Sequence, residues 1–215
     1  MSLLNGHEVI CCDRNRRGGL KRIFLMDKAE LSVAPSYSAA NNVYNSFPTT
    51  KLYEFQFDRY TGGFDANATR ENGSTVVNVQ LNFYIPKVTA KANKVLDMLA
   101  KTCGLIAIVE TYADDCGTPA GADPAANPAV PAKTYHFVLG YDEIFKDDSY
   151  LDFVSGEETT GVALQDANGA QVALAGDAAM YPIGLNVGPD TGDLEIVAST
   201  GSTGPEDAYT ISVVA

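Results

Sequence analysis

The two histidines of this chain, His7 and His136, are the side chains best suited to acid–base chemistry near neutral pH. His7 lies in a polar N-terminal stretch, whereas His136 lies in an alternating segment that is typical of a β-strand. A Ser-His-Asp or Cys-His site needs a histidine that a second group orients, and the spacing of the sequence indicates no such partner. We therefore interpret His136 as a structural residue.

Carboxylates and thiols offer metal binding as a second chemistry. Asp190, Asp193 and Glu195 lie in an Asp-Thr-Gly-Asp-Leu-Glu stretch, but their spacing is not that of an EF-hand, and a solvated turn is the favoured interpretation. The cysteines form no CxxC pair, so we expect free thiols in a reducing compartment. They are Cys11, Cys12, Cys103 and Cys116. Two adjacent acidic pairs, whose side chains we expect to point apart, complete the candidates: Asp114-Asp115 and Asp147-Asp148.

Motifs for nucleotide binding and for zinc proteases are missing from the sequence. The sequence therefore predicts no catalytic, cofactor-binding or metal-binding residues and no enzymatic activity. It also holds no apolar run of the roughly 18 residues that a membrane span needs, and its N-terminus lacks the pattern of a secretory signal. We expect synthesis in the cytoplasm, no membrane partner, and a function based on assembly.

Charge is unevenly distributed along the 215 residues, which carry a net charge of -12. Residues 1–101 hold 13 Lys+Arg and 9 Asp+Glu, whereas residues 102–215 hold 2 and 18. A general nucleic-acid binder needs a continuous basic face, so this asymmetry argues against one. The asymmetry suits head-to-tail stacking of copies, a wall past which DNA slides without sticking, or simply a well-solvated acidic half.

The first part of the chain combines a basic arm with a strand and a loop. Residues 1–22 contain Arg14, Arg16 and Arg17, and we interpret them as an arm that contacts either nucleic acid or an acidic neighbouring subunit. The segment 20–31 predicts a strand. Residues 32–50 are rich in Ser, Asn, Pro and Ala, which predicts a surface loop.

The clearest pattern begins with two strands. Residues 52–58 alternate, which predicts a half-buried strand with Tyr53, Phe55 and Phe57 on one face. Thr61-Gly62-Gly63 predicts a break or bulge, after which the strand resumes over residues 64–70.

A tight hairpin and one helix follow. Asn72-Gly73 predicts the hairpin turn because both residues tolerate positive φ, and we expect this tip to reach a neighbouring subunit. The return strand places apolar side chains on one face: Val77, Val79, Leu81, Phe83 and Ile85. After Pro86, apolar residues recur at helical spacing until Gly104: Val88, Ala92, Val95, Leu96, Leu99 and Cys103. We expect this helix to cover a β core, and the segment 52–104 to build the assembly.

Shorter strands complete the prediction. Residues 105–112 and 135–141 predict two strands that flank an Ala/Pro-rich loop at residues 113–133. Further short strands are predicted at residues 150–154, 161–165 and 170–174, with a turn at residues 166–169. Residues 194–198 and 209–214 predict a terminal hairpin. We therefore divide the chain into a β domain, residues 1–183, and a C-terminal hairpin extension, residues 184–215.

The order of these segments resembles a known family, the tail tube (major tail) proteins of tailed bacteriophages, especially those of Bacteroidetes-type hosts. The resemblance covers roughly residues 20–182 and rests on topology and turn chemistry. The segments that carry it are Tyr53–Phe57, Ala68–Ser74, Phe83–Lys87, Leu99–Lys101, Gly104–Glu110, His136–Gly140 and Gly161–Asp166.

This resemblance implies a mainly β fold, a β-sandwich or small barrel with one flanking α-helix. It implies self-association into rings, commonly six-fold, that stack into a tube within the phage tail, with the chain made in the cytoplasm of the bacterial host. DNA would pass through the lumen without specific binding, and other tail proteins such as a sheath or a terminator would be partners. The alternatives are another virion protein (tail terminator, head–tail connector or capsid decoration protein) and a β-rich adhesin or binding module.

Overall fold

The computed structural model describes residues 19–31, 33–47, 51–55, 61–71, 73–111, 135–160, 168–187, 194–198 and 208–213. Over these residues the protein is mainly β, with one α-helix and two sheets, as the sequence predicted. The first sheet contains β1 (Leu20–Asp27), β2 (Ser36–Ser38), β3 (Val43–Ser46), β4 (Leu52–Phe55), β7 (Leu105–Thr111), β8 (His136–Leu139), β11 (Ile183–Leu185), β12 (Leu194–Ala198) and β13 (Ala208–Val213). The second sheet contains β5 (Gly62–Glu71), β6 (Ser74–Pro86), β9 (Asp152–Thr159) and β10 (Gly169–Ala178).

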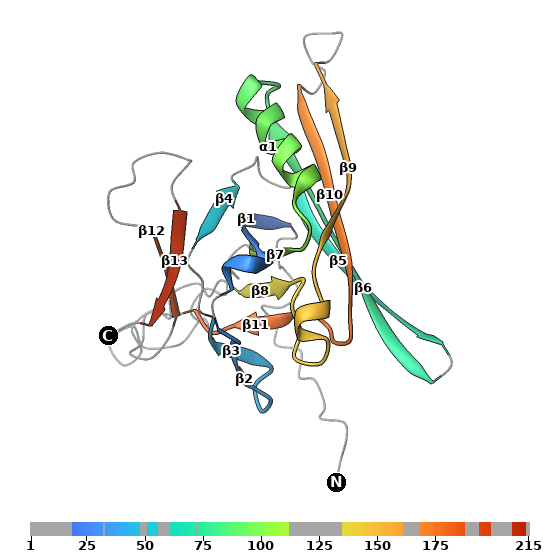
Figure 1. The fold of residues 1–215 in the computed structure, drawn as a ribbon, viewed down its shortest axis with the longest axis vertical. Coiled ribbons are helices and arrows are strands. Elements are labelled where there is room, and N and C mark those ends of the chain that lie inside the picture. The colour runs from blue at the N-terminus through green and yellow to red at the C-terminus, as the bar shows by residue number, and fades with distance from the viewer. Residues whose placement is uncertain are drawn as a thin grey trace, which may run out of the picture.

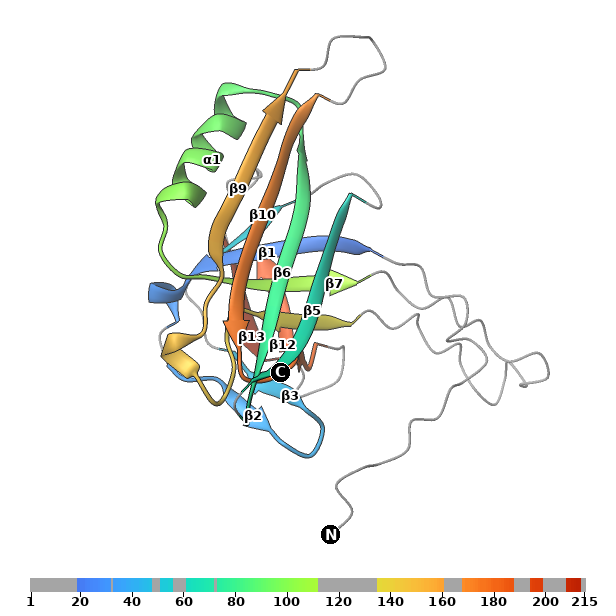
Figure 2. The ribbon, with the colours of Figure 1, turned by 90° about the vertical axis from the view of Figure 1, so that its right-hand side faces the viewer.

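The four-stranded sheet has the order β5-β6-β10-β9, and every neighbouring pair is antiparallel. Figure 2 looks onto this sheet, with β1 and β7 of the other sheet running across behind it. The predicted hairpin is confirmed: Glu71 pairs with Ser74, and Gly73 adopts a φ of 83° that L side chains rarely adopt. The predicted alternation of the return strand is confirmed as well, because Val77, Leu81 and Phe83 are buried while Asn78 and Gln80 are exposed.

The nine-stranded sheet has the order β12-β13-β4-β1-β7-β8-β11-β3-β2. It curls back on itself, because Val187, two residues after β11, forms a parallel bridge with Leu194 at the start of β12. The curled sheet therefore encloses one core and offers its outer wall to a second core beneath the four-stranded sheet (Figure 1).

The shared wall between these cores is β1 and β7, whose side chains alternate between them. Ile23, Ala107 and Val109 belong to the core beneath the four-stranded sheet, and Phe24 and Ile108 belong to the core inside the curled sheet. The first core also contains Val79, Leu81, Phe83, Leu139, Leu151, Val172 and Leu174. The second also contains Met26, Tyr44, Phe47, Leu52, Val138, Tyr141, Ile183, Leu185 and Leu194.

The predicted helix is confirmed as α1 (Ala90–Lys101). It begins after Thr89, whose hydroxyl accepts a hydrogen bond of 3.0 Å from the backbone N–H of Ala92. Its apolar stripe faces the core beneath the four-stranded sheet through Leu99, Val95 and Leu96. The helix therefore covers that core on the side of β9, as Figure 2 shows.

The predicted surface loop at residues 32–50 is wrong over its described part. β2 and β3 pair there as a small antiparallel hairpin, and β3 also pairs in parallel with β11. Tyr44 and Phe47 are fully buried in the core of the curled sheet, where their rings meet edge to face at 5.5 Å. Two aromatic side chains thus order a segment whose polar composition is typical of a loop.

The strand predicted at residues 52–58 is confirmed for β4, but its half-buried pattern is not. Leu52 is buried inside the curled sheet, Phe55 packs against the other core, and Tyr53 is 44% exposed. The reason is that apolar layers cover both faces of the sheet at this strand. Residues 56–58 lie outside the described residues.

The C-terminal hairpin is confirmed as β12 and β13, which pair over residues 194–198 and 209–213. β13 continues the nine-stranded sheet beside β4. β11 (Ile183–Leu185) pairs with both β8 and β3, so the predicted boundary between residues 183 and 184 falls within a strand of this sheet. The strands predicted at residues 105–112 and 135–141 are confirmed as β7 and β8, which pair with each other. The predicted strand at residues 161–165 and the loop at residues 113–133 lie outside the described residues.

Candidate assembly surface

The outer face of the four-stranded sheet is acidic. The register places Asp65 of β5, Asp177 of β10, and Asp152 and Glu157 of β9 on this face, and all four side chains are exposed. The remaining outward side chains of its middle strands are uncharged: Asn78, Gln80, Asn82, Tyr84, Gln171, Ala173 and Ala175. Among the described side chains of these four strands, none of the outward ones is lysine or arginine. Such a surface repels phosphate groups.

The two outer strands of this sheet, β5 and β9, each pair with a single strand of the described chain. β5 is ten residues long and β9 is eight, and every second residue of an outer antiparallel strand turns its backbone N–H and C=O away from its partner strand. Free edges of this length are templates for pairing with another chain. All neighbouring strands are antiparallel, so β9 runs antiparallel to β5 as well.

The hairpin of β5 and β6 extends past the rest of the sheet. β10 ends at Ala178, which pairs with Val77, so residues 74–76 of β6 have β5 as their strand partner and lie beyond β10. The side chains of Thr69, Arg70 and Thr75 near this tip are exposed. Figure 1 shows the tip projecting away from both cores.

A buried charge cluster lies at one end of the curled sheet and is centred on Glu110, which is 2% exposed. A β-bulge between Leu20 and Arg22 lets two consecutive cations reach this carboxylate. The Nζ atom of Lys21 lies 2.7 Å from Oε1, and Nε of Arg22 lies 2.5 Å from Oε2. Arg22 also reaches Glu54 at 3.5 Å.

His136 borders this cluster rather than a reactive group. It is 6% exposed, and its Nε2 lies 3.9 Å from Oε2 of Glu110. Burial lowers the pKa of His136. Burial alone would raise the pKa of Glu110, but the hydrogen bonds from Lys21 and Arg22 outweigh it and hold that pKa below its ordinary value. No nucleophile faces the imidazole among the contacts of the described residues, so the arrangement is suited to holding strands together.

The other candidate residues are scattered. Asp147 and Asp148 lie in an exposed 3-10 helix, Lys146–Asp148. Cys103 is an exposed, free cysteine. Glu195 lies in β12, and the structure describes its backbone. The remaining candidates lie outside the described residues: His7, Cys11, Cys12, Arg14, Arg16, Arg17, Asp114, Asp115, Cys116, Asp190 and Asp193.

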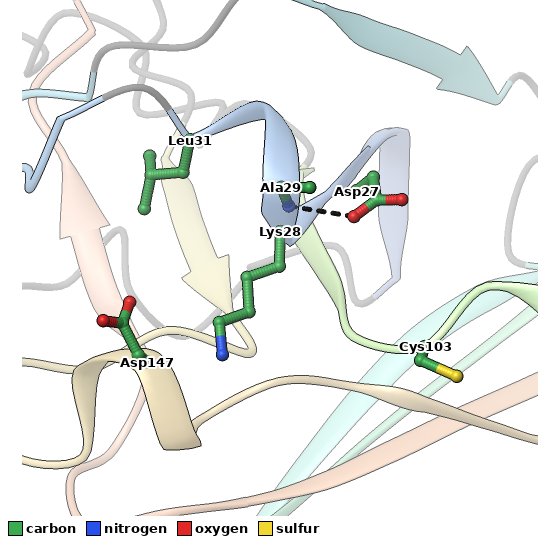
Figure 3. A pocket seen from close by; sticks show the side chains of 6 residues that line it. All are labelled: Asp27, Lys28, Ala29, Leu31, Cys103 and Asp147. Carbon is green, nitrogen blue, oxygen red and sulfur yellow. Dashed lines mark hydrogen bonds between the residues drawn. The ribbon is translucent and has the colours of Figure 1, made fainter.

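A shallow depression of about 330 Å³ lies at the opposite end of β1 and is lined by Asp27, Lys28, Ala29, Leu31, Cys103 and Asp147. Figure 3 shows the sulfur of Cys103 pointing away from the other lining side chains. The described residues include no group of three or more His, Cys, Asp or Glu side chains suited to hold a metal ion. The depression therefore gathers no group that would activate a thiol or bind a cation.

Comparisons with known proteins add no relative: no family model matches the sequence, no curated protein matches it, and no solved structure matches the fold. Among the described helices, none has the length and apolar character that would let it cross a membrane. A function therefore has to be inferred from the sheet and its surfaces. The alternation of residues 77–85 indicated one strand of this face. Nothing in the sequence indicated that β10 pairs with this strand or that β9 pairs with β10.

Proposed function

We propose that this protein is a virion structural protein whose copies assemble into rings, and that the rings stack into the tail tube of a bacteriophage. The observation that carries the proposal is the four-stranded sheet, which combines two free edges with an acidic outer face. An assembly that joins these sheets edge to edge turns the acidic faces into one continuous surface. The resemblance of the sequence to tail tube proteins supports the same function.

The strand directions support ring closure. Rotation about a ring axis leaves strand direction unchanged, so β9 of one copy would meet β5 of the next copy in the antiparallel sense that the sheet already uses. Such a head-to-tail contact closes into a ring when the rotation allows it. Pairing β9 with β9 would instead bring the exposed carboxylates of Asp152, Glu157 and Glu158 together, which is unfavourable.

The dimensions of such a ring suit a conduit. Neighbouring strands lie about 4.8 Å apart, so the four strands of one copy contribute about 19 Å to the circumference of the ring. Six copies then give a circumference of about 115 Å and a diameter of about 37 Å between opposing backbones. The exposed carboxylates would face the lumen and repel the phosphates of passing DNA. The hairpin tip near Gly73 would extend beyond its own subunit toward a neighbour.

Electron microscopy of the purified full-length chain tests the proposal. We expect rings and open-ended tubes, whereas a tail terminator would stop at single rings. A chain that stays monomeric under every assembly condition would overturn the proposal. Labelling of intact particles should then place many copies along the tail, and labelling confined to the capsid would identify a decoration protein instead.

A substitution on the free edge of β5 tests the contact itself. Glu71 and Ser74 pair across a two-residue connection, so the backbone N–H of Ala68 points away from β6. Ala68→Pro removes that N–H at an exposed position and should abolish assembly while the monomer stays folded by circular dichroism. Ala68→Ser keeps the N–H and should assemble normally. Equal assembly of both variants would exclude β5 as the contact.

A further inference from the structure

The cluster around Glu110 leaves His136 buried without a firm partner. The imidazole is 6% exposed, and its Nδ1 has no hydrogen-bond partner in the described structure. Its Nε2 lies 3.9 Å from Oε2 of Glu110, which is too long for a hydrogen bond. Both oxygens of Glu110 already accept hydrogen bonds, one from Lys21 and one from Arg22.

Among the described residues, the charged side chains of this cluster balance only while the imidazole is neutral. β1 contributes the cations of Lys21 and Arg22, β4 contributes Glu54, and β7 contributes Glu110. β11, on the other side of β8, places Leu185 opposite His136 and adds no charge. A proton on His136 would therefore add an unbalanced positive charge to a buried site, and such a charge is costly.

We propose that this cluster is an acid-sensitive latch, which holds the ends of β1, β7 and β8 together while His136 is neutral and loosens when His136 takes up a proton from solvent. These strand ends are the places where residues 1–18 join β1 and where residues 112–135 connect β7 to β8. The core inside the curled sheet reaches this end through Phe24, over whose ring Arg22 lies at 5.3 Å. The latch goes beyond the tail tube function and does not depend on it.

The direction of the pH effect follows from the site. Burial lowers the pKa of His136 below its ordinary value of 6.5, and the cations of Arg22 and Lys21 lower it further, against the opposing effect of Glu110. The unfolded chain therefore binds a proton at this histidine at a higher pH than the folded chain does. The contribution of the neutral His136 to stability is therefore present above pH 6.5 and declines as the pH falls below that value.

Urea unfolding of the full-length chain, followed by circular dichroism at pH 6.5 and one unit above and below it, tests the latch. The chain has two histidines, so His7→Gln is the matched control for His136→Gln. We expect the folding equilibrium constant of the wild type and of H7Q to fall by up to about tenfold per pH unit below 6.5. H136Q should keep a constant value, and a wild-type slope in H136Q would overturn the proposal.

Nuclear magnetic resonance of the wild type keeps the proposal testable if H136Q does not fold. An imidazole of His136 that titrates below 6.5 supports the latch, and one that titrates at or above that value overturns it. Acid should change the amide signals of Glu110 and Val138 before those of α1. Simultaneous loss of all signals would mean global unfolding and would overturn a local latch.

Discussion

Replacing Phe83 with alanine tests how the four-stranded sheet is held to its core. Phe83 is fully buried, and its ring meets that of Phe55 edge to face at 5.6 Å. Its neighbour across the strand pair is Gly62, which has no side chain that could fill the space left behind. Because the cavity cannot collapse from that side, we expect a loss near the upper end of the usual range, about 4–5 kcal/mol.

The adjacent residue provides the control. Asn82 lies on the opposite, outward face, so Asn82→Ala should change the free energy of unfolding by less than about 0.5 kcal/mol. The chain contains no tryptophan, so urea unfolding followed by circular dichroism is the assay, at one protein concentration for all variants. A double-mutant cycle with Phe55→Ala should give a coupling of about 0.5–1.5 kcal/mol. An N82A variant as destabilised as F83A would refute the assigned faces of β6.

Four further substitutions, one of them a control, test other parts of the structure by the same unfolding assay. Gly176→Ala should destabilise by roughly 1–3 kcal/mol, because its Cβ would lie 1.9 Å from the carbonyl oxygen of Tyr150, whereas Gly63→Ala meets no atom within 4 Å and should be near neutral. Glu110→Gln should cost about 1–3 kcal/mol at neutral pH. Since the pKa of Glu110 lies below its ordinary value of 4.5, this deficit should shrink as the pH falls below that value. Thr89→Ala should cost about 1 kcal/mol through loss of the helix cap, and no change would exclude that cap.

Local patterns predicted the elements whose stability is local. The hairpin between β5 and β6 was predictable because Gly73 supplies the positive φ of the turn and because residues 77–85 alternate strictly. α1 was predictable from its apolar spacing and from Pro86 before it. In both cases the residues that specify the element are contiguous in the sequence.

Long-range packing decided what the sequence did not reveal. The burial of Tyr44 depends on β11, which pairs with β3 from about 140 residues away in the chain. The charge cluster depends on a bulge in β1 that brings Lys21 and Arg22 to Glu110, and nothing in residues 20–22 indicates that bulge. The acidic face was equally hidden, because it combines Asp65 with Asp177 through strands that meet only in the folded sheet.

The shared wall has a consequence for how far this sequence can drift. β7 is buried on both faces over residues 105–110, so each position there is constrained by one of the two cores or, at Glu110, by the charge cluster. The four-stranded sheet contributes only alternate residues to a core, which leaves the exposed outward positions of β6 and β10 open to change, such as Gln80 and Gln171. Descendants of this chain could therefore remodel their outward chemistry extensively while the wall behind it stays almost fixed.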